Sequence, residues 1–378
     1  MIDRIYIDNF RTLVNVTIPL KRNALLLGEN GTGKTSVLDA LRSIQRFVSG
    51  EFPVKAAFPT SELTRWQKSP AQRFEIDLRT GEGVYHYELL LHHDMVAKLG
   101  QVRKELLTLD GKTLFEYSEG TAHLYNDTFR AGPSFPFDWF KAPLGTVYSR
   151  PDNTKLTNFK NQLAKILIVK PCPPMMAAES PREDAELSDR AENFVSWYRY
   201  IQRQAIAKQH RLFDEISKYI PGFKSLDIPG SAEGPVLMHA NFALPGSAEG
   251  MPASGDEHKT IPYGFDKLSD GQRMLILLFT LLYALPDAGW SLFIDEPDNY
   301  VALREIQPWL LSLCDAVGDG IEQSVLCSHH PEIIDYLAEN HGVWFFRDAG
   351  GPTRASDKLS PPIAHITPAE AVARGWVK

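Results

Sequence analysis

The segment Leu25–Leu41, with the sequence LLLGENGTGKTSVLDAL, decides the fold of this chain. It begins with three leucines, continues through a glycine-rich loop, and ends in a stretch whose apolar residues recur with helical spacing. The leucines are typical of a strand buried on both faces, and the later spacing predicts an amphipathic helix. A strand, a glycine-rich loop and a helix in this order predict an α/β protein.

The loop has the residues that a P-loop uses to hold a phosphate chain. Its glycines let backbone N–H groups converge on phosphate oxygens, and the N-terminus of the following helix adds a favourable dipole. In this motif the lysine neutralises the β- and γ-phosphates, and the next hydroxyl ligates Mg²⁺. We therefore predict a nucleotide site with Lys34 as a catalytic cation and Thr35 as a metal ligand. The predicted binding residues are Gly28, Asn30, Gly31, Thr32, Gly33, Lys34, Thr35 and Ser36.

A second motif, SLFIDEPD at residues 291–298, places two adjacent carboxylates after an apolar run. At the C-terminal end of a strand they would project toward the phosphate site of an α/β sheet. We expect Asp295 to hold Mg²⁺ through water and Glu296 to polarise the attacking water. Acidic residues after a strand are common by themselves, so this interpretation depends on the P-loop.

Two further motifs each have a simpler structural interpretation. LSDGQR at residues 268–273 precedes an almost entirely apolar helix. Its serine, its glycine and the helix N-terminus could bind a phosphate, but for the motif alone we favour the simpler interpretation of a buried helix capped by Ser269. SVLCSHHPEII at residues 324–334 ends a strand at a histidine pair. A histidine there could contact the γ-phosphate or position water, and the simpler interpretation is a loop histidine.

The rest of the chain changes its pattern from segment to segment. Residues 1–27 alternate apolar and polar positions as half-buried strands do, and residues 73–125 read as an antiparallel meander. Asp110-Gly111 within the meander is a hairpin turn signal. The remaining segments are predicted to be loops with short helices over 126–185, helices over 186–220, alternating helices and strands over 263–346, and an irregular tail with a short helix near Pro368.

The composition is that of a globular protein with a sizeable core: 378 residues, 43% hydrophobic and 23% charged. The three cysteines fit no metal or disulfide spacing, which favours a reducing compartment. The longest apolar run, Met274–Leu285, is too short to span a bilayer, and the N-terminus carries no hydrophobic signal core. These features predict a cytoplasmic protein with no membrane partner. The net charge of −7 argues against a uniformly basic nucleic-acid surface.

The four motifs stand in the order P-loop, LSDGQR, Asp-Glu and His, which resembles the order in ATP-binding-cassette (ABC) ATPases. LSDGQR resembles the signature LSGGQ, with Asp270 in place of the first glycine of the pair. IDNFR at residues 7–11 and SHHPEII at residues 328–334 are similar to segments of the SMC, RecF and OLD-like branch and of its AAA-15/21-type relatives. The resemblance covers roughly residues 1–50 and 263–346.

The resemblance implies a P-loop NTPase of the ABC/RecF type. Such a fold has a mixed central sheet with flanking helices, an antiparallel β meander lobe and a helical insert. We therefore predict three parts: residues 1–125 as the first part of the ATPase head with the P-loop and the meander, 126–262 as a loop-rich and helical insert that forms a second lobe or binds a partner, and 263–378 as the second part of the head.

In ATPases of this kind two heads enclose two ATP molecules, and each site joins the P-loop of one subunit to the signature of the other. The resemblance implies that Ser269, Gly271 and Gln272 grip the γ-phosphate bound by a second copy. It also assigns His329 to the catalytic switch segment and lets Arg11 face the nucleotide. ATP and Mg²⁺ are the implied cofactors.

The chain also departs from the family. The segment PDNYVAL after Glu296 has no later Asp or His, so the contact between subunits would come from Asp298 or Asn299. The family's Q-loop glutamine has no clear counterpart, and Gln72 is a candidate by position alone. A long coiled-coil arm and a TOPRIM domain are not visible, which counts against cohesin-like tethering and against an OLD-type nuclease.

These features predict an ATP-hydrolysing switch or clamp that works as a homodimer or a higher oligomer in prokaryotic anti-phage defence or DNA repair. Its partner is expected to be a separately encoded effector such as a nuclease. Direct DNA contact stays open, because Lys and Arg residues in 199–224 would form a basic stripe, although a solvated helix face explains them more simply.

Two other functions remain as alternatives. A transporter-coupled ABC cassette would have a short spacing between P-loop and signature, whereas Ser269 follows Thr35 by more than 230 residues. A nucleotide-dependent scaffold with little hydrolysis would have a defective site, whereas Lys34, Asp295 and Glu296 are all intact.

Overall fold

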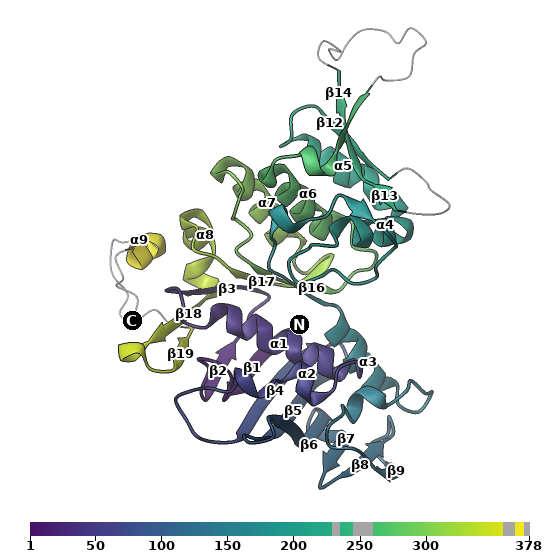
Figure 1. The fold of residues 1–378 in the computed structure, drawn as a ribbon, viewed down its shortest axis with the longest axis vertical. Coiled ribbons are helices and arrows are strands. Elements are labelled where there is room, and N and C mark those ends of the chain that lie inside the picture. The colour runs from purple at the N-terminus through teal and green to yellow at the C-terminus, as the bar shows by residue number, and fades with distance from the viewer. Residues whose placement is uncertain (229–234, 245–259, 358–366, 374–378) are drawn as a thin grey trace. The chain divides into compact units, whose positions relative to one another are not determined.

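The computed structural model describes residues 1–228, 235–244, 260–357 and 367–373. The chain divides into two compact units, drawn together in Figure 1. Unit 1 comprises Met1–Ile166 and Val325–Lys378, and unit 2 comprises Leu167–Ser324. Because unit 1 is made from both ends of the chain, residues far apart in sequence meet inside it. The three-part division expected from the motifs, with boundaries after residues 125 and 262, stays a prediction.

Within the described part of unit 1, eight strands form one sheet in the order β2-β1-β4-β5-β6-β7-β8-β9. Each neighbouring pair is antiparallel, which confirms the predicted meander. The sequence did not predict that the N-terminal strands join the same sheet through pairing of β1 with β4. The strands are β1 (Ile2–Asp8), β2 (Val16–Pro19), β4 (Ala71–Thr80), β5 (Gly83–Asp94), β6 (Leu99–Leu109), β7 (Lys112–Ser118), β8 (Thr121–Tyr125) and β9 (Ala131–Pro136).

One face of this sheet is apolar and is covered by helices α1 (Lys34–Val48), α2 (Val54–Ala57) and α3 (Thr154–Ala164), as Figure 1 shows. Phe58 links α1 to the sheet, because its ring lies 5.6 Å from that of Phe47 and 4.9 Å from that of Phe74. On α3, Phe159 stacks on Tyr87 of β5 with ring centres 5.6 Å apart. The contacts of Phe58 hold the P-loop helix α1 on the sheet, and the contact of Phe159 holds α3.

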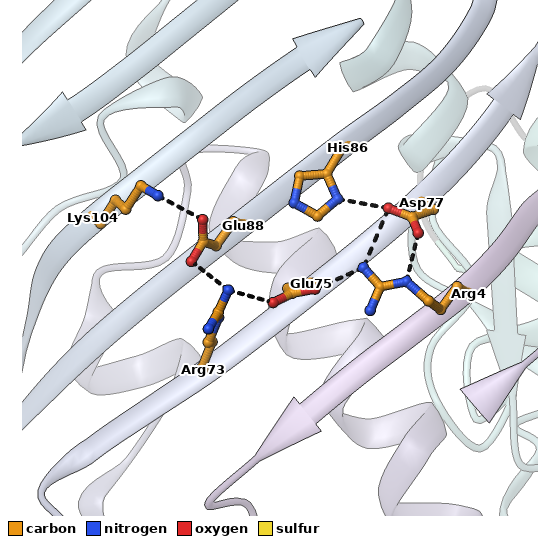
Figure 2. A network of polar contacts seen from close by, with 7 residues as sticks. All are labelled: Arg4, Arg73, Glu75, Asp77, His86, Glu88 and Lys104. Atoms are coloured by element: carbon orange, nitrogen blue, oxygen red, sulfur yellow. Dashed lines mark hydrogen bonds and ion pairs between the residues drawn. The ribbon is translucent and has the colours of Figure 1, made fainter. Parts of the chain in front are cut away.

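The opposite face of the sheet carries a ladder of alternating acids and bases (Figure 2). Arg73 binds both Glu75 (2.6 Å) and Glu88 (3.0 Å), although both carboxylates are buried. Burial alone would raise the pKa of Asp77, but hydrogen bonds from Arg4 and His86 hold it below its ordinary value. The acids therefore remain paired in this layer. The full ladder runs through Lys104, Glu88, Arg73, Glu75, Arg4, Asp77 and His86.

The P-loop strand belongs to a second sheet, in which the order continues β17-β3-β18-β19. Strand β17 (Ile321–Cys327) begins in unit 2 and ends in unit 1. Strand β3 (Asn23–Gly28) has four consecutive buried residues, as its leucine run predicted. It pairs in parallel with β18 (Gly342–Arg347), which pairs antiparallel with β19 (Thr353–Ser356). Helices α8 (Pro331–His341) and α9 (Pro368–Ala373) also belong to this unit. Helix α9 confirms the predicted helix near Pro368, whereas β19 corrects the expectation of an otherwise irregular tail.

Unit 2 is built around helix α6 (Asp270–Tyr283), which is buried from Met274 to Leu282. The indole Nε1 of Trp309 on α7 (Leu303–Ala316) donates to the carbonyl of Leu278 on α6 at 3.1 Å. Strand order in this unit runs β10-β16-β17. Its other elements include α4 (Phe194–Gln204) and α5 (Gln209–Ser217), which confirm the predicted helices, and β10 (Ile166–Val169), β12 (Phe223–Asp227), β14 (His239–Ala243), β15 (Thr260–Gly264), β16 (Trp290–Asp295) and β17 (Ile321–Cys327).

Candidate nucleotide site

The P-loop begins at Gly28, the last residue of β3, where the neighbouring strand leaves no room for a side chain. Gly28 has φ 145° and pairs with Phe345 of β18. A Cβ atom at Gly28 would lie 2.1 Å from the carbonyl oxygen of Phe345. Only glycine lets the chain leave the strand here and turn into the loop.

The loop ends at Gly33, which adopts the left-handed conformation with φ 102° and is the N-cap residue of α1. A Cβ atom there would lie 2.7 Å from Thr12 Oγ1 and 2.9 Å from Thr353 Oγ1. Among the described residues no side chain caps this helix, and its first turn carries no acidic residue. No carboxylate of that turn therefore offsets the positive end of the α1 dipole, which suits a bound phosphate.

The side chain of Lys34 folds back over the loop. Lys34 is only 6% exposed. Its Nζ donates to the carbonyls of Gly28 at 2.7 Å and Glu29 at 3.2 Å. Thr32 is also turned inward and donates its hydroxyl to the Glu29 carbonyl at 2.7 Å. The loop's backbone thus places an ammonium group where the motif requires a phosphate-neutralising charge.

The other predicted loop residues differ in exposure. Asn30 and Gly31 at the loop tip and Thr35 at the start of α1 are exposed, whereas Ser36 is buried. The tip and the Thr35 side chain are therefore accessible to solvent. Their predicted contacts with nucleotide, Mg²⁺ and a second subunit stay predictions.

Arg11 lies beside α1, but its guanidinium is already engaged. It forms ion pairs with Asp39 of α1 and with Glu62, and its backbone N–H donates to the Glu62 carbonyl at 2.7 Å. Its φ of 50° places it in a tight turn. The structure therefore connects Arg11 to the P-loop helix through Asp39, and its predicted contact with the nucleotide stays a prediction.

A buried polar network holds the turn that precedes Arg11. Gln72 donates its amide to the carbonyl of Asn9 at 2.9 Å and contacts His93 Nε2 at 3.1 Å, and the other ring nitrogen of His93 contacts Thr60 Oγ1 at 3.2 Å. Burial lowers the pKa of His93 to about 4, so the ring is neutral at physiological pH. The Gln72 side chain is fully buried in this network, and its identity as the Q-loop glutamine stays a prediction.

In unit 2, Ser269 is the N-cap of α6 and forms a capping box with Gln272. The Ser269 hydroxyl accepts from the Gln272 N–H at 3.2 Å, and the Gln272 side chain accepts from the Ser269 N–H at 2.9 Å. A Cβ atom at Gly271 would lie 2.7 Å from the Tyr300 carbonyl. The simpler structural interpretation of the motif is therefore confirmed, and since Ser269 is exposed, its contact with a second subunit stays a prediction.

The acidic pair lies at the end of β16 in unit 2. Asp295 is 8% exposed and is the last residue of the strand. Glu296 has φ 52°, a left-handed conformation that costs a non-glycine residue about 1 kcal/mol. Asn299 returns its N–H to the Glu296 carbonyl at 3.2 Å and closes the turn. Ten other described non-glycine residues also have a positive φ, so the catalytic role of Glu296 stays a prediction.

The two histidines after β17 have different surroundings. His330 caps α8, because its Nδ1 accepts from the Glu332 N–H at 3.3 Å. The backbone N–H of His330 donates to the fully buried Ser328 hydroxyl at 2.9 Å. His330 thus has a structural role, and the switch role remains assigned to His329, which is half-buried in the same unit as the P-loop.

The basic stretch at residues 199–224 makes its contacts within unit 2. The Nζ of Lys208 donates to the carbonyls of Leu285 and Pro286, where α6 ends. These contacts agree with a solvated structural face, and direct DNA contact stays a prediction. The other contacts are Arg199 and Arg203 with Glu183, Arg211 over the Tyr283 ring, and Lys218 with Glu215.

Two P-loop contacts come from residues that the sequence did not single out. Arg347 NH1 donates to the Gly31 carbonyl at 3.1 Å, and Thr353 Oγ1 donates to the Thr32 carbonyl at 2.7 Å. They lie 316 and 321 residues from their partners, in a segment expected to be irregular. The short run GVWFFRD predicted β18, but nothing local indicated its hairpin with β19.

Within the described residues, no group of three His, Cys, Asp or Glu side chains is arranged to hold a metal ion. The predicted Mg²⁺ contacts of Thr35 and Asp295 therefore stay a prediction. Within the same ranges, no helix combines the length and the apolarity needed to cross a membrane.

Solved structures share this fold at low sequence identity. An SMC head bound to the C-terminal winged-helix domain of ScpA has a TM-score of 0.55 and 12% identity, with 94% of this chain and 97% of that chain covered. An SMC head with an extended coiled coil, bound to the C-terminal domain of ScpA derived from Pyrococcus furiosus, has a TM-score of 0.50 and 11% identity, with 94% and 95% covered. No curated protein matches the chain in sequence.

A protein-family model described as "AAA domain, putative AbiEii toxin, Type IV TA system" matches residues 24–335. The match includes the P-loop, the signature-like segment, the Asp-Glu pair and the histidine pair. The α/β architecture with several sheets agrees with it. The chain therefore belongs to this AAA family and has the fold of an SMC/RecF-like, ABC-type P-loop ATPase.

Proposed function

We propose that this protein is an ATP-driven dimeric switch. ATP binding at the P-loop joins two copies of the chain, and hydrolysis separates them. One observation carries the proposal: Lys34 Nζ lies over the Gly28 and Glu29 carbonyls, at the start of a helix that has no acidic residue in its first turn. This arrangement concentrates positive charge where the motif places a triphosphate.

The proposal gives the remaining motif residues distinct roles. Thr35 and Asp295 would hold Mg²⁺, which supplies positive charge beside the phosphate oxygens when it is bound. Glu296 would orient and polarise the attacking water, and its strained backbone supports this assignment. His329 would respond to the presence of the γ-phosphate. These assignments rest on the motifs and on the local geometry of each residue.

The second half of each site would come from the other copy of the chain. Ser269, Gly271 and Gln272 stand at the N-terminus of α6, a 14-residue helix whose dipole favours an anion. Its first turn carries the acidic Asp270, whose charge is paired with Arg273. A phosphate gripped by this helix end and by a P-loop would favour the closed dimer over separate subunits. Loss of the γ-phosphate removes that difference in binding free energy, so the dimer opens.

We place this switch in prokaryotic defence or DNA repair, with a separately encoded effector such as a nuclease as its partner. The family description names an AbiEii toxin of a type IV toxin–antitoxin system, which supports a defence role. The solved SMC heads are bound to domains of ScpA, which supports the idea that a head of this fold can carry another protein. The paired basic stretch at residues 199–224 favours a protein effector over extensive DNA contact.

The Glu296→Gln variant tests the switch. In ATP and Mg²⁺ we expect mass photometry to show a stable dimer, and we expect ATP turnover to be largely lost, because the amide cannot take up a proton from water. Glu339→Gln is a matched control, since Glu339 is exposed on α8 and has no proposed role. Unchanged turnover in Glu296→Gln, together with no ATP-dependent assembly, would contradict the proposal.

A further inference from the structure

Arg347 and Thr353 face each other across the β18–β19 hairpin as directly paired residues. Directly opposite residues of an antiparallel pair project on the same side of the sheet. Both side chains reach the same segment, because Arg347 binds the Gly31 carbonyl and Thr353 binds the Thr32 carbonyl. The hairpin therefore holds two successive carbonyl groups of the P-loop.

The direction of the Thr353 hydrogen bond follows from its partners. Thr353 is fully buried, and its Oγ1 lies 2.7 Å from the Thr32 carbonyl and 2.9 Å from Thr12 Oγ1. A hydroxyl has one hydrogen, and a carbonyl oxygen can only accept. The Thr353 hydroxyl therefore donates to the Thr32 carbonyl and accepts from the Thr12 hydroxyl. The Thr12 carbonyl in turn accepts the backbone N–H of Thr353 at 2.8 Å.

These two bonds fix the direction of the neighbouring N–H groups. In a planar trans peptide the C=O and the following N–H point in opposite directions. With the Thr32 carbonyl held by Thr353, the Gly33 N–H faces away from the hairpin, at the residue that begins α1. With the Gly31 carbonyl held by Arg347, the Thr32 N–H turns to the Glu29 carbonyl at 3.3 Å and closes the loop.

Arg347 is itself firmly held. Its Nε and NH2 donate to the carbonyls of Gly351 and Gly350 at 2.6 Å each, and its guanidinium lies 4.9 Å from the centre of the Trp66 ring. The planar guanidinium can make these contacts and the Gly31 contact at the same time. The P-loop tip is thereby tied to the hairpin and to the segment that carries Trp66.

We propose that Arg347 and Thr353 are positioning residues that orient the P-loop backbone for phosphate binding. This inference rests on the proposed function, since it takes the P-loop as the nucleotide site. Neither residue needs to touch the nucleotide. Their effect passes through the peptide groups between Gly31 and Gly33, so it should be the same for any ligand that presents a phosphate chain.

Isothermal titration of the full chain with Mg-ADP and with tripolyphosphate tests the role of Thr353. Thr353→Val keeps the shape and removes the hydroxyl, and we expect affinity for both probes to fall by about three- to tenfold, the effect of one lost hydrogen bond. Thr353→Ser restores the hydroxyl, so affinity should return to within about twofold of the native value. Thermal melting measured in parallel separates this effect from a loss of folded protein.

Arg347→Met tests the second contact, and Arg354→Met is its control. Arg354 is the next residue after Thr353 on β19, and its side chain is exposed. We expect Arg347→Met to lower the affinity for both probes by a similar factor. Arg354→Met should leave both affinities unchanged. If native protein, Thr353→Val and Arg347→Met bind the probes with equal affinity, the positioning role is overturned while the proposed nucleotide site stands. If the native protein binds neither probe, the proposed nucleotide site itself fails.

Discussion

The Nζ atom of Lys34 lies 2.7 Å from the carbonyl oxygen of Gly28, so the first and last parts of the P-loop are joined by a charged hydrogen bond. A phosphate chain in the loop would compete with the Gly28 and Glu29 carbonyls for this ammonium. Because the side chain is buried, these two carbonyls stabilise its positive charge. The loop is thus already shaped around the charge that the proposed reaction uses.

Replacing Lys34 with methionine should abolish turnover. We expect ATP affinity to fall at least tenfold, because charge-assisted hydrogen bonds contribute about 1.5–3 kcal/mol. Lys21→Met is a suitable control, since Lys21 is an exposed lysine that also donates to a backbone carbonyl, that of Asn340. Titration with ATP and a phosphate-release assay provide the measurements. Native-like ATP affinity in Lys34→Met would show that the loop does not bind the nucleotide as proposed.

Alanine substitutions at Gly28 and Gly31 should differ sharply in stability. At Gly28 the new Cβ would meet the Phe345 carbonyl at 2.1 Å, so we expect a loss of about 3 kcal/mol or more. At Gly31 nothing lies within 4 Å of a new Cβ, and only the positive φ of 78° opposes it, at about 1 kcal/mol. Urea unfolding of both variants measures the difference. Equal losses would mean that β18 does not confine the loop.

Variants at Ser269 should separate its structural role from its proposed functional role. Ser269→Ala removes the cap of α6 and should cost about 1 kcal/mol of stability. Ser269→Asn keeps a good capping group, so its stability should stay close to native. If the hydroxyl also grips a phosphate of a second copy, Ser269→Asn should still lose ATP-dependent assembly. If Ser269→Asn assembles and turns over ATP as native protein does, Ser269 acts only as the cap of α6.

Glu105 should make stability depend on pH. Burial raises its pKa to about 7 in the folded chain, although the Tyr87 hydroxyl (2.8 Å) and the Leu144 N–H (2.9 Å) donate to its carboxylate. In the unfolded chain the Glu105 carboxyl ionises near its ordinary pKa of 4.5. Its contribution to the free energy of unfolding is therefore complete below pH 4.5 and is lost as the pH rises through 7. The free energy of unfolding that Glu105 contributes and loses over this range is about 3 kcal/mol.

The pH effect of Glu105 is measured by comparing native protein with Glu105→Gln, because other carboxylates also titrate. The free energy of unfolding in urea, followed from about pH 5 to pH 8, should fall more steeply in native protein than in the glutamine variant. Parallel curves for the two proteins would mean that Glu105 is already ionised in the fold.

The elements around the P-loop could be predicted from the sequence because their signals are local. The leucine run gave β3, the helical spacing gave α1, and Asp110-Gly111 forms the expected tight turn with φ values of 46° and 75°. The sequence LSDGQR also predicted the N-cap at Ser269, although the same residues are compatible with a phosphate contact. The structure shows the cap, and the two roles are compatible.

The contacts that shape the loop could not be predicted in the same way. The pairing of β1 with β4 and the contacts of Arg347 and Thr353 with the P-loop join residues that are distant in sequence. They arise when the two ends of the chain fold together in unit 1, and no periodic pattern encodes such a meeting. The contacts of Gln72 were hidden for a related reason, because its partners Asn9 and His93 lie 63 and 21 residues away in sequence.

Mixing two inactive variants tests directly whether two copies of the chain share each ATP site. Lys34→Met lacks a working P-loop and Ser269→Asn lacks a working signature, so each variant alone should hydrolyse almost no ATP. If each site is shared between two copies, a mixed dimer carries one intact site. Turnover in an equal mixture should then rise well above that of either variant alone. A mixture as inactive as its two components would contradict the claim that two copies of this chain build one ATP site.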